Sequence, residues 1–442
     1  MVKHPDSGKA GFQRRLTGLV NVEQDEVRAL LWSFSYFFAL LCSYYIIRPM
    51  RDEMGIAGGV ESLQWLFTGT FLAMLAAVPL FGWVTSRYSC KQFLPWIYLF
   101  FIANLLLFFV LFRSGLTHAW VARAFFIWTS VFNLFIVSVF WSFMADIYSN
   151  DQARRLFGFI AAGGTAGALT GPALTATLAL QLGPTNLLLI SAGCLSWAVF
   201  CVRRLIAWRD GTAGKAATGA GTEPDGKGEG MGGSIWGGLR LLAKSPYLLG
   251  IGLLILFYTT LSTFLYFQQA QIVRDSFSAP AQRTTVFAAM DFATNGLTIL
   301  IQVFLTGRIV KALGIGWTLA LVPLLLGAGF LVLGLAPLLG VLVIVQVVRR
   351  AGNYAIMKPS REMLYVVLGQ EEKYKAKNVI DTAMYRSGDV LSAWAYAGLQ
   401  ALGFGLSAIA FIAVPLAGVW SWLCYKLGRE QEKRAQPEEK LL

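Results

Sequence analysis

The stretch that decides the fold is GWTLALVPLLLGAGFLVLGLAPLLGVLVIVQVV, residues Gly316 to Val348, which contains no charged side chain. A helix that crosses the hydrocarbon core of a bilayer needs about 20 predominantly apolar residues. The stretch therefore predicts one membrane span over 316–335 and the beginning of a second at 338. Each charge inside hydrocarbon costs free energy, yet four cations follow at once. They are Arg349, Arg350, Lys358 and Arg361.

The whole chain of 442 residues has the composition of a membrane protein. It is 56% hydrophobic and only 14% charged, and its mean hydropathy is +0.59. The apolar residues form about a dozen long blocks, which indicates a polytopic α-helical membrane protein. The first 28 residues are polar and lack the short apolar core of a signal peptide. We therefore predict that the first helix is itself the insertion signal.

The net charge of +13 would suggest nucleic-acid binding in a soluble protein. In a membrane protein it indicates basic cytoplasmic loops and contact with anionic lipid headgroups, so we predict lipid partners and no nucleic acid. The five cysteines lie mostly inside apolar blocks and have no metal-ligand spacing, which is typical of small core residues. Two histidines exclude a histidine metal cluster, and we predict neither a metal nor a cofactor.

Twelve spans are predicted, six on each side of the Gly-rich charged segment Asp210 to Gly233. Its composition is that of a flexible linker. The predicted order is an N-tail (1–28), a six-helix bundle (29–208), a linker (209–245), a second six-helix bundle (246–427) and a C-tail (428–442). The predicted spans are 29–47, 62–84, 93–112, 121–145, 156–180, 186–207, 246–268, 284–306, 316–335, 338–362, 378–402 and 405–427.

Basic residues are distributed unevenly between the alternate loops. If both termini are cytoplasmic, the tails and the loops on that side hold most of the Lys and Arg. This asymmetry follows the positive-inside rule, so we predict a multi-pass protein of the bacterial inner membrane with both termini in the cytoplasm. The arginines left on the opposite side are Arg48, Arg51, Arg113, Arg123, Arg274 and Arg283.

The two halves of the chain resemble each other. YYIIRPMRDEMG (44–55) follows the first span, and YFQQAQIVRDSF (266–277) follows the seventh. Short turns with glycine and a basic residue follow the second and eighth spans. Six spans plus six with matching loops is the arrangement of the major facilitator superfamily, whose halves rock about a central site. The predicted fold is therefore all-α, of the major-facilitator type.

The cations at the tenth span fall on one helical face. Arg350, Tyr354, Lys358 and Arg361 are spaced so that an α-helix aligns them. Such a stripe cannot face lipid, and it predicts a water-filled cavity or a bound anion. The alternatives are that Arg361 snorkels to the cytoplasmic interface and that Arg349 pairs with an acid. Pro359 removes a backbone hydrogen bond and predicts a break in this helix, as in the discontinuous helices of transporters.

A second basic cluster follows the first span, and the apolar segments hold several acids. We expect Arg51 to pair with Asp52, either as an outer gate or beside a cavity. Asp291 stands alone in an apolar span, where it is either a proton-coupling acid or the partner of a cavity arginine. The spacing of Arg386 and Asp389 predicts an intrahelical pair. The residues predicted for coupling or gating are Asp52, Asp146, Asp291, Glu362, Asp381, Arg386 and Asp389.

Other patterns exclude whole classes of protein. Gly163, Gly167 and Gly171 are four apart, which predicts close helix packing. The chain contains no GxxxxGK[ST] phosphate-binding loop, so we do not predict a primary ATP-driven pump. It also lacks a set of Ser, His and Asp for nucleophilic catalysis, and we predict that it is not an enzyme.

The stretch KPSREMLYVVLGQEEKYKAKNVIDTAMYRSGD (358–389) resembles the ATP/ADP translocase family of plastids and obligate intracellular bacteria, which is related to the major facilitators. Members carry a similar Pro-x-[Lys/Arg]-Glu-Met segment followed by Lys-x-Lys-x-x-Ile-Asp. The segments YYIIRPMRDEMG and FMADIY also resemble that family. The likeness covers most of the chain, and it implies nucleotide exchange. Carried over from the family, the charged transport residues fall on Arg51, Asp146 and Arg361.

This chain departs from the family near the seventh span. Thr263 stands in place of an acid, Gln268, Gln269 and Gln271 stand in place of cations, and Lys358 stands where the exchangers tend to have Asp. A triphosphate site needs several converging cations. In this chain they gather at the tenth span instead, so the local chemistry supports an anionic or amphiphilic organic solute.

The resulting prediction is a secondary transporter that moves an anionic organic solute by alternating access through a cavity between the bundles. The alternatives are a proton-coupled exporter of a drug, siderophore or lipid-like amphiphile, and a scaffold or sensor on a transporter fold. We expect a monomer. The residues predicted to bind substrate are Tyr44, Tyr45, Arg48, Arg51, Tyr266, Gln268, Arg350, Tyr354, Lys358 and Arg361.

Overall fold

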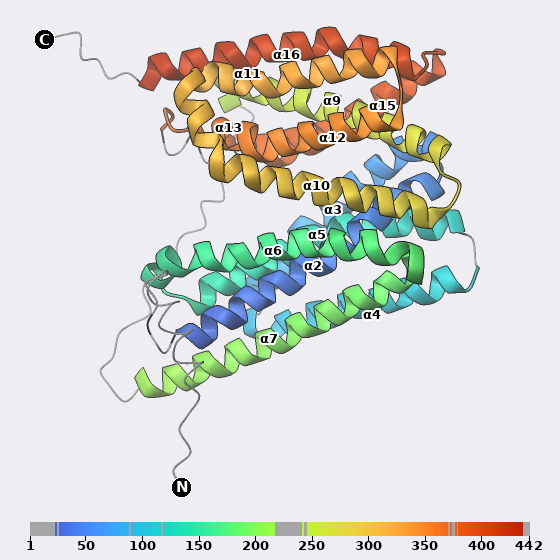
Figure 1. Ribbon diagram of the computed structural model, residues 1–442. Coiled ribbons are helices and arrows are strands. Elements are labelled where there is room, and N and C mark those ends of the chain that lie inside the picture. Colours follow the sequence, from blue (N-terminus) through green and yellow to red (C-terminus); the bar gives the residue numbers. More distant parts are fainter. Residues whose placement is uncertain are drawn as a thin grey trace, which may run out of the picture. The chain divides into compact units, whose positions relative to one another are not determined.

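The computed structural model describes residues 23, 26–87, 90–115, 118–216, 241–242, 245–369, 372–373, 376–377 and 379–435. Most of the predicted N-tail, residues 217–240 of the predicted linker and residues 436–442 of the C-tail lie outside these residues. Regular structure within them is helical (Figure 1). Eleven helices are long and apolar enough to cross a membrane, which confirms the predicted all-α membrane fold.

The helices lie over the predicted spans, and several of them extend well beyond the predicted ends. The first half contains α2 (Val27–Ala57), α3 (Leu63–Arg87), α4 (Cys90–Arg113), α5 (His118–Ile147), α6 (Asn150–Leu182) and α7 (Leu187–Ala216). The second half contains α9 (Pro246–Ser276), α10 (Pro280–Phe304), α11 (Thr306–Leu335), α12 (Leu339–Gly352), α13 (Lys358–Leu364), α15 (Tyr385–Ala401) and α16 (Leu406–Ala435). Short 3₁₀ turns, η1 (Val60–Ser62) and η2 (Pro184–Asn186), and π turns, η3 (Asn353–Met357) and η4 (Val379–Met384), join or interrupt them.

Two segments differ from the prediction. The turn expected after the eighth span is helical, because α11 already begins at Thr306 and bends at Gly314, whose φ is 71°. Glycine adopts that left-handed conformation without steric cost, and the next backbone N–H, on Ile315, donates to Glu432 Oε1 at 2.9 Å. The eleventh predicted span begins as the π turn η4, so α15 itself has only 17 residues.

The described chain forms two compact units. Unit 1 comprises Met1–Met54, Ala73–Gly226 and Thr284–Ala289, and unit 2 comprises Gly55–Leu72, Lys227–Arg283 and Met290–Leu442. The first turns of α3 thus group with the second half of the chain. The division into bundles 29–208 and 246–427 stays a prediction.

Unit 1 is held together by close approach of α6 to α2. A side chain at Gly163, Gly167 or Gly171 would collide with backbone atoms of Phe34, Phe38 and Cys42, so the predicted small-residue packing is confirmed. Aromatic rings fill the rest of this core. Phe37 stacks on Phe140, with ring centroids 4.0 Å apart.

Unit 2 is built around α9, α11 and α16. Helices α11 and α16 lie side by side along much of their length (Figure 1), and α9 packs against both α15 and α16. Gly428 approaches the backbone of Gly316 so closely that a Cβ has no room there. These supports position α12, η3 and α13, which together form the tenth predicted span.

Candidate functional site

The tenth span is interrupted in the middle by the π turn η3. The N–H of Lys358 bonds to the carbonyl of Asn353, five residues back, so the carbonyl of Tyr354 loses its usual donor. Pro359 has no N–H and leaves the carbonyl of Ala355 without a donor as well. Gln302 Nε2 donates to the Tyr354 carbonyl at 3.2 Å, and Thr306 Oγ1 donates to the Ala355 carbonyl at 2.8 Å. Both freed acceptors are therefore satisfied by side chains from the junction of α10 and α11, as the low-dielectric membrane requires.

The interrupted helix lines a pocket of about 470 Å³ in unit 2. Six of the predicted site residues meet there, supplied by η3, α13, η4 and α15, and residues of α9 form another wall. The lining comprises Leu254, Ile255, Tyr258, Asn353, Tyr354, Met357, Lys358, Arg361, Glu362, Lys377, Asp381, Tyr385 and Arg386. We call this set the basic pocket.

Ion pairs cross the wall of the basic pocket. Arg361 Nη2 lies 3.0 Å from Asp381 Oδ1, and Lys377 Nζ lies 2.5 Å from Glu362 Oε2. The pairs are half-buried, so their partners can be exchanged for a ligand at modest cost. Lys358 is exposed, and none of the described carboxylates lies within 4.0 Å of its ammonium group.

The predicted pair of Arg386 and Asp389 is present, at 3.9 Å. Tyrosine rings add a second kind of surface to the pocket. Tyr258 and Tyr385 have ring centroids 6.0 Å apart, and the guanidinium of Arg386 lies 5.8 Å from the Tyr385 ring. Together the lining offers cations for an anion and aromatic faces for an apolar or planar group.

Arg350 does not line the basic pocket. Its Nη2 lies 2.6 Å from Oδ1 of Asp291 on α10, and the two side chains are 9% and 1% exposed. Of the two interpretations of Asp291, this geometry matches the partner of an arginine. The single stripe of four residues fails because it assumes 3.6 residues per turn throughout, whereas η3 inserts an extra residue between Arg350 and Lys358.

Neighbouring Arg349 is buried in a neutral network. Its Nε donates to Gln346 Oε1 at 3.0 Å, and its Nη1 donates to Ser262 Oγ at 2.7 Å. Gln346 in turn donates to Oε1 of Gln269 on α9. The acidic partner considered for Arg349 is not found among the described residues.

The predicted residues of unit 1 form a separate group. Arg51 pairs with Asp52 at 3.2 Å, as expected, and its guanidinium lies 4.0 Å from the centroid of the Phe126 ring. The guanidinium of Arg48 lies 5.6 Å from the Tyr45 ring, which in turn contacts Tyr44 edge-on at 5.2 Å. Asp146 is exposed in the last turn of α5.

Two further predicted residues of unit 2 lie outside the basic pocket. The Tyr266 ring packs edge-on against Phe67, with centroids 5.6 Å apart. Gln268 is 1% exposed and donates to the Leu406 carbonyl at 3.1 Å, so its amide joins α9 to the start of α16. The Arg274–Asp275 pair, at 3.0 Å, repeats in unit 2 the Arg51–Asp52 pair of unit 1.

The sequence interpretation missed several residues of the basic pocket. Lys377 is the clearest, because it belongs to the Lys-x-Lys-x-x-Ile-Asp motif that was recognised but not used. Tyr258 and Tyr385 carry no sequence signal beyond their helical spacing. Among the described residues no cluster of His, Cys, Asp and Glu is suited to a metal ion.

Comparison with known proteins accords with this architecture. A family model described as Major Facilitator Superfamily matches residues 29–368. ADP,ATP carrier protein 1 of Chlamydia muridarum is 23% identical over an alignment of 477 positions, which covers 91% of this chain and 88% of the relative. The same carrier of Chlamydia trachomatis is 22% identical with equal coverage. The resemblance to ATP/ADP translocases is thereby confirmed.

Solved structures give the same fold. The nucleoside transporter NupG has a TM-score of 0.62 at 12% identity and covers 93% of this chain and 100% of its own. The POT family transporter PepTSo also has a TM-score of 0.62 at 12% identity, with 92% and 98% covered. Since the family model covers most of the chain, this multi-pass membrane protein, a transporter and not an enzyme, belongs to the Major Facilitator Superfamily.

Proposed function

We propose that this transporter moves an anionic organic solute, such as a nucleotide or another phosphorylated metabolite, by alternating access. The observation that carries the proposal is the basic pocket, where Lys358, Arg361, Lys377 and Arg386 surround a space of about 470 Å³. That volume is within the range of small-molecule sites. Its position beside an interrupted helix is also where transporters of this architecture bind substrate.

The charges of the pocket favour an anion. Its four cations face only two lining acids, Glu362 and Asp381, and both acids are already paired. A phosphate or carboxylate group would bind Lys358 and compete with Asp381 for Arg361 by charge-assisted contacts. Tyr258, Tyr354 and Tyr385 would then contact the rest of the solute.

The relatives support the same substrate class. The matching Chlamydia proteins are named ADP,ATP carriers, and the most specific stretch of the resemblance, 358–389, supplies most of the pocket lining. Exchange of one solute for another, location in the bacterial inner membrane, cytoplasmic termini and a monomeric state remain parts of this proposal, together with Arg48, Arg51 and Asp146 as further residues of the path.

Proton-coupled export of an amphiphile is the second candidate, with Asp291 as the coupling acid. Its burial at 1% exposure favours it, and the ion pair opposes it because the carboxylate is already held by Arg350. Proton flux into proteoliposomes that persists in the double variant Arg350→Ala/Asp291→Ala, in which both charges are removed, would eliminate this candidate.

The proposal is tested with purified protein in proteoliposomes that contain ADP, by uptake of radiolabelled ATP and of a labelled sugar phosphate. Loss of one charge-assisted contact weakens binding about ten- to hundredfold, so we expect that loss of uptake at subsaturating solute for Lys358→Gln and for Arg361→Gln. Lys311→Gln is the matched control, because Lys311 is exposed on α11 and does not line the pocket. Uptake that is unchanged in both pocket variants would refute the assignment.

A further inference from the structure

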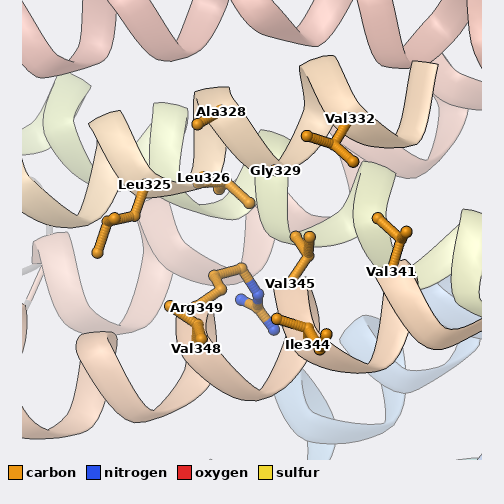
Figure 2. A pocket seen from close by; sticks show the side chains of 10 residues that line it. All are labelled: Leu325, Leu326, Ala328, Gly329, Val332, Val341, Ile344, Val345, Val348 and Arg349. Carbon is orange, nitrogen blue, oxygen red and sulfur yellow. The ribbon is translucent and has the colours of Figure 1, made fainter. Parts of the chain in front are cut away.

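Unit 2 has a second hollow, between α11 and α12, which is separate from the basic pocket. It has a volume of about 300 Å³, and Arg349 is the one charged residue among its lining side chains. Figure 2 shows this guanidinium amid the aliphatic side chains of the two helices. We call this hollow the apolar groove. The lining comprises Leu325, Leu326, Ala328, Gly329, Val332, Val341, Ile344, Val345, Val348 and Arg349.

The apolar groove opens outward between spanning helices. Ile344 is 65% exposed, and Leu325 and Val332 are each 46% exposed. In helices that cross a bilayer, exposed aliphatic side chains of this kind are suited to acyl chains. The groove can therefore take a hydrocarbon chain without exposing apolar surface to water.

Arg349 has unused hydrogen-bonding capacity. A guanidinium has five N–H donors, and the described residues accept from Nε and from one N–H of Nη1. Both acceptors are neutral, and the Arg349 side chain is buried, at only 9% exposure. A buried cation without an anion is costly, and the described residues leave three N–H groups of the guanidinium, two of them on Nη2, for a carboxylate.

The depth of Arg349 limits the kind of anion. Helical residues rise about 1.5 Å each, so Arg349 lies about 15 Å along the span that begins at Leu339 and ends at Leu364. That position is near the middle of a hydrocarbon core of about 30 Å. The headgroup of a phospholipid stays at the interface, whereas a free fatty acid can bring its carboxylate this far.

We propose that the apolar groove binds a long-chain fatty acid, with its chain along α11 and α12 and its carboxylate on Arg349. The volume is at the lower end of the range for ligand sites, so a single chain fits and part of it extends into the surrounding lipid. This site is independent of the solute proposed for the basic pocket.

The test is equilibrium binding of radiolabelled palmitate to the full-length protein in phosphatidylcholine nanodiscs, with hexadecanol as a neutral probe of equal chain length. We expect saturable palmitate binding that is about ten- to hundredfold weaker in Arg349→Gln and largely retained in Arg349→Lys. Palmitate should also bind more tightly than hexadecanol. Equal affinity of the two probes, or unchanged binding in Arg349→Gln, would overturn the proposal.

A second variant covers the case in which Arg349→Gln does not fold. Ala328 is exposed and lines the groove, so Ala328→Trp fills the groove without disturbing the core and should abolish saturable palmitate binding. Leu331→Trp is the matched control, because Leu331 is 44% exposed on the same helix and does not line the groove. Full binding in Ala328→Trp, or equal loss in the control, would also overturn the proposal.

Discussion

Helices α12 and α13 belong to one interrupted span but hold their arginines in different ways. Arg350 on α12 and its partner Asp291 are almost fully buried, 2.6 Å apart. Arg361 on α13 pairs with Asp381, which is 30% exposed, at 3.0 Å beside open space. The first pair is fixed because both side chains are almost closed to water. The second borders the basic pocket, where water or a solute could replace the partner. We therefore expect exposure, more than the presence of a charge, to separate structural from binding residues in this span.

The strongest test of that contrast is the loss of Arg350. Arg350→Ala removes the ion-pair partner of the buried Asp291 carboxylate, which costs about 3–5 kcal/mol. We expect a large fall in the melting temperature of the detergent-solubilised protein, and little folded protein on size-exclusion chromatography. The double variant Arg350→Ala/Asp291→Ala removes both charges and should recover part of the loss. Wild-type stability in the single variant would show that the pair is not the structural element we infer.

The interruption of the span at η3, between α12 and α13, can be tested separately. Thr306→Val keeps the shape of the side chain but leaves the Ala355 carbonyl without its donor, at a cost of about 1–3 kcal/mol. The matched control is Thr298→Val on α10, because the Thr298 hydroxyl donates only to the carbonyl of Thr294 in its own helix. We expect thermal unfolding to shift to lower temperature in the first variant and hardly in the second.

A double-variant cycle makes this prediction sharper. Pro359→Ala restores a backbone N–H that can reach the Ala355 carbonyl. The Thr306→Val substitution should therefore cost less stability in the Pro359→Ala background than in the wild type. Additive effects would mean that the hydroxyl does not compensate for the proline.

The sequence was sufficient for the fold because length and polarity alone decide it. Long uncharged blocks require spanning helices, and basic residues in alternate loops follow a rule that needs no coordinates. The close packing of α6 could also be predicted from the sequence, because small residues repeated every four positions typically form a helix–helix contact.

The residues of the candidate site could be predicted from the sequence only in part, for a geometric reason. The spacing of an α-helix predicted that Arg350 would lie beside Lys358, but the π turn η3 changes that spacing. The sequence NYAIM of this turn contains no signal that predicts the extra residue. Pro359 was recognised as a break, whereas its compensating partner Thr306 is about fifty positions away in the chain. Contacts between distant segments, such as those of Lys377 with Glu362 or Arg350 with Asp291, depend on packing that one sequence does not display.

The smallest expected loss of stability comes from removing the acid of the more exposed ion pair, Arg361 with Asp381. Asp381→Asn removes the partner of Arg361, but the pair, with side chains 12% and 30% exposed, borders the basic pocket. Because this pair is less buried than Arg350 and Asp291, the loss of stability should be smaller, about 1 kcal/mol. In Asp291→Asn the loss of stability should approach the loss expected for Arg350→Ala. Uptake of the anionic solute should increase in Asp381→Asn, because Arg361 without its acidic partner attracts an anion more strongly. Parallel melting curves and uptake assays of the two variants measure both quantities. If Asp381→Asn destabilised the protein as much as Asp291→Asn, the two regions would not differ in the way their exposure indicates, and Arg361 would have to be reassigned as a structural residue.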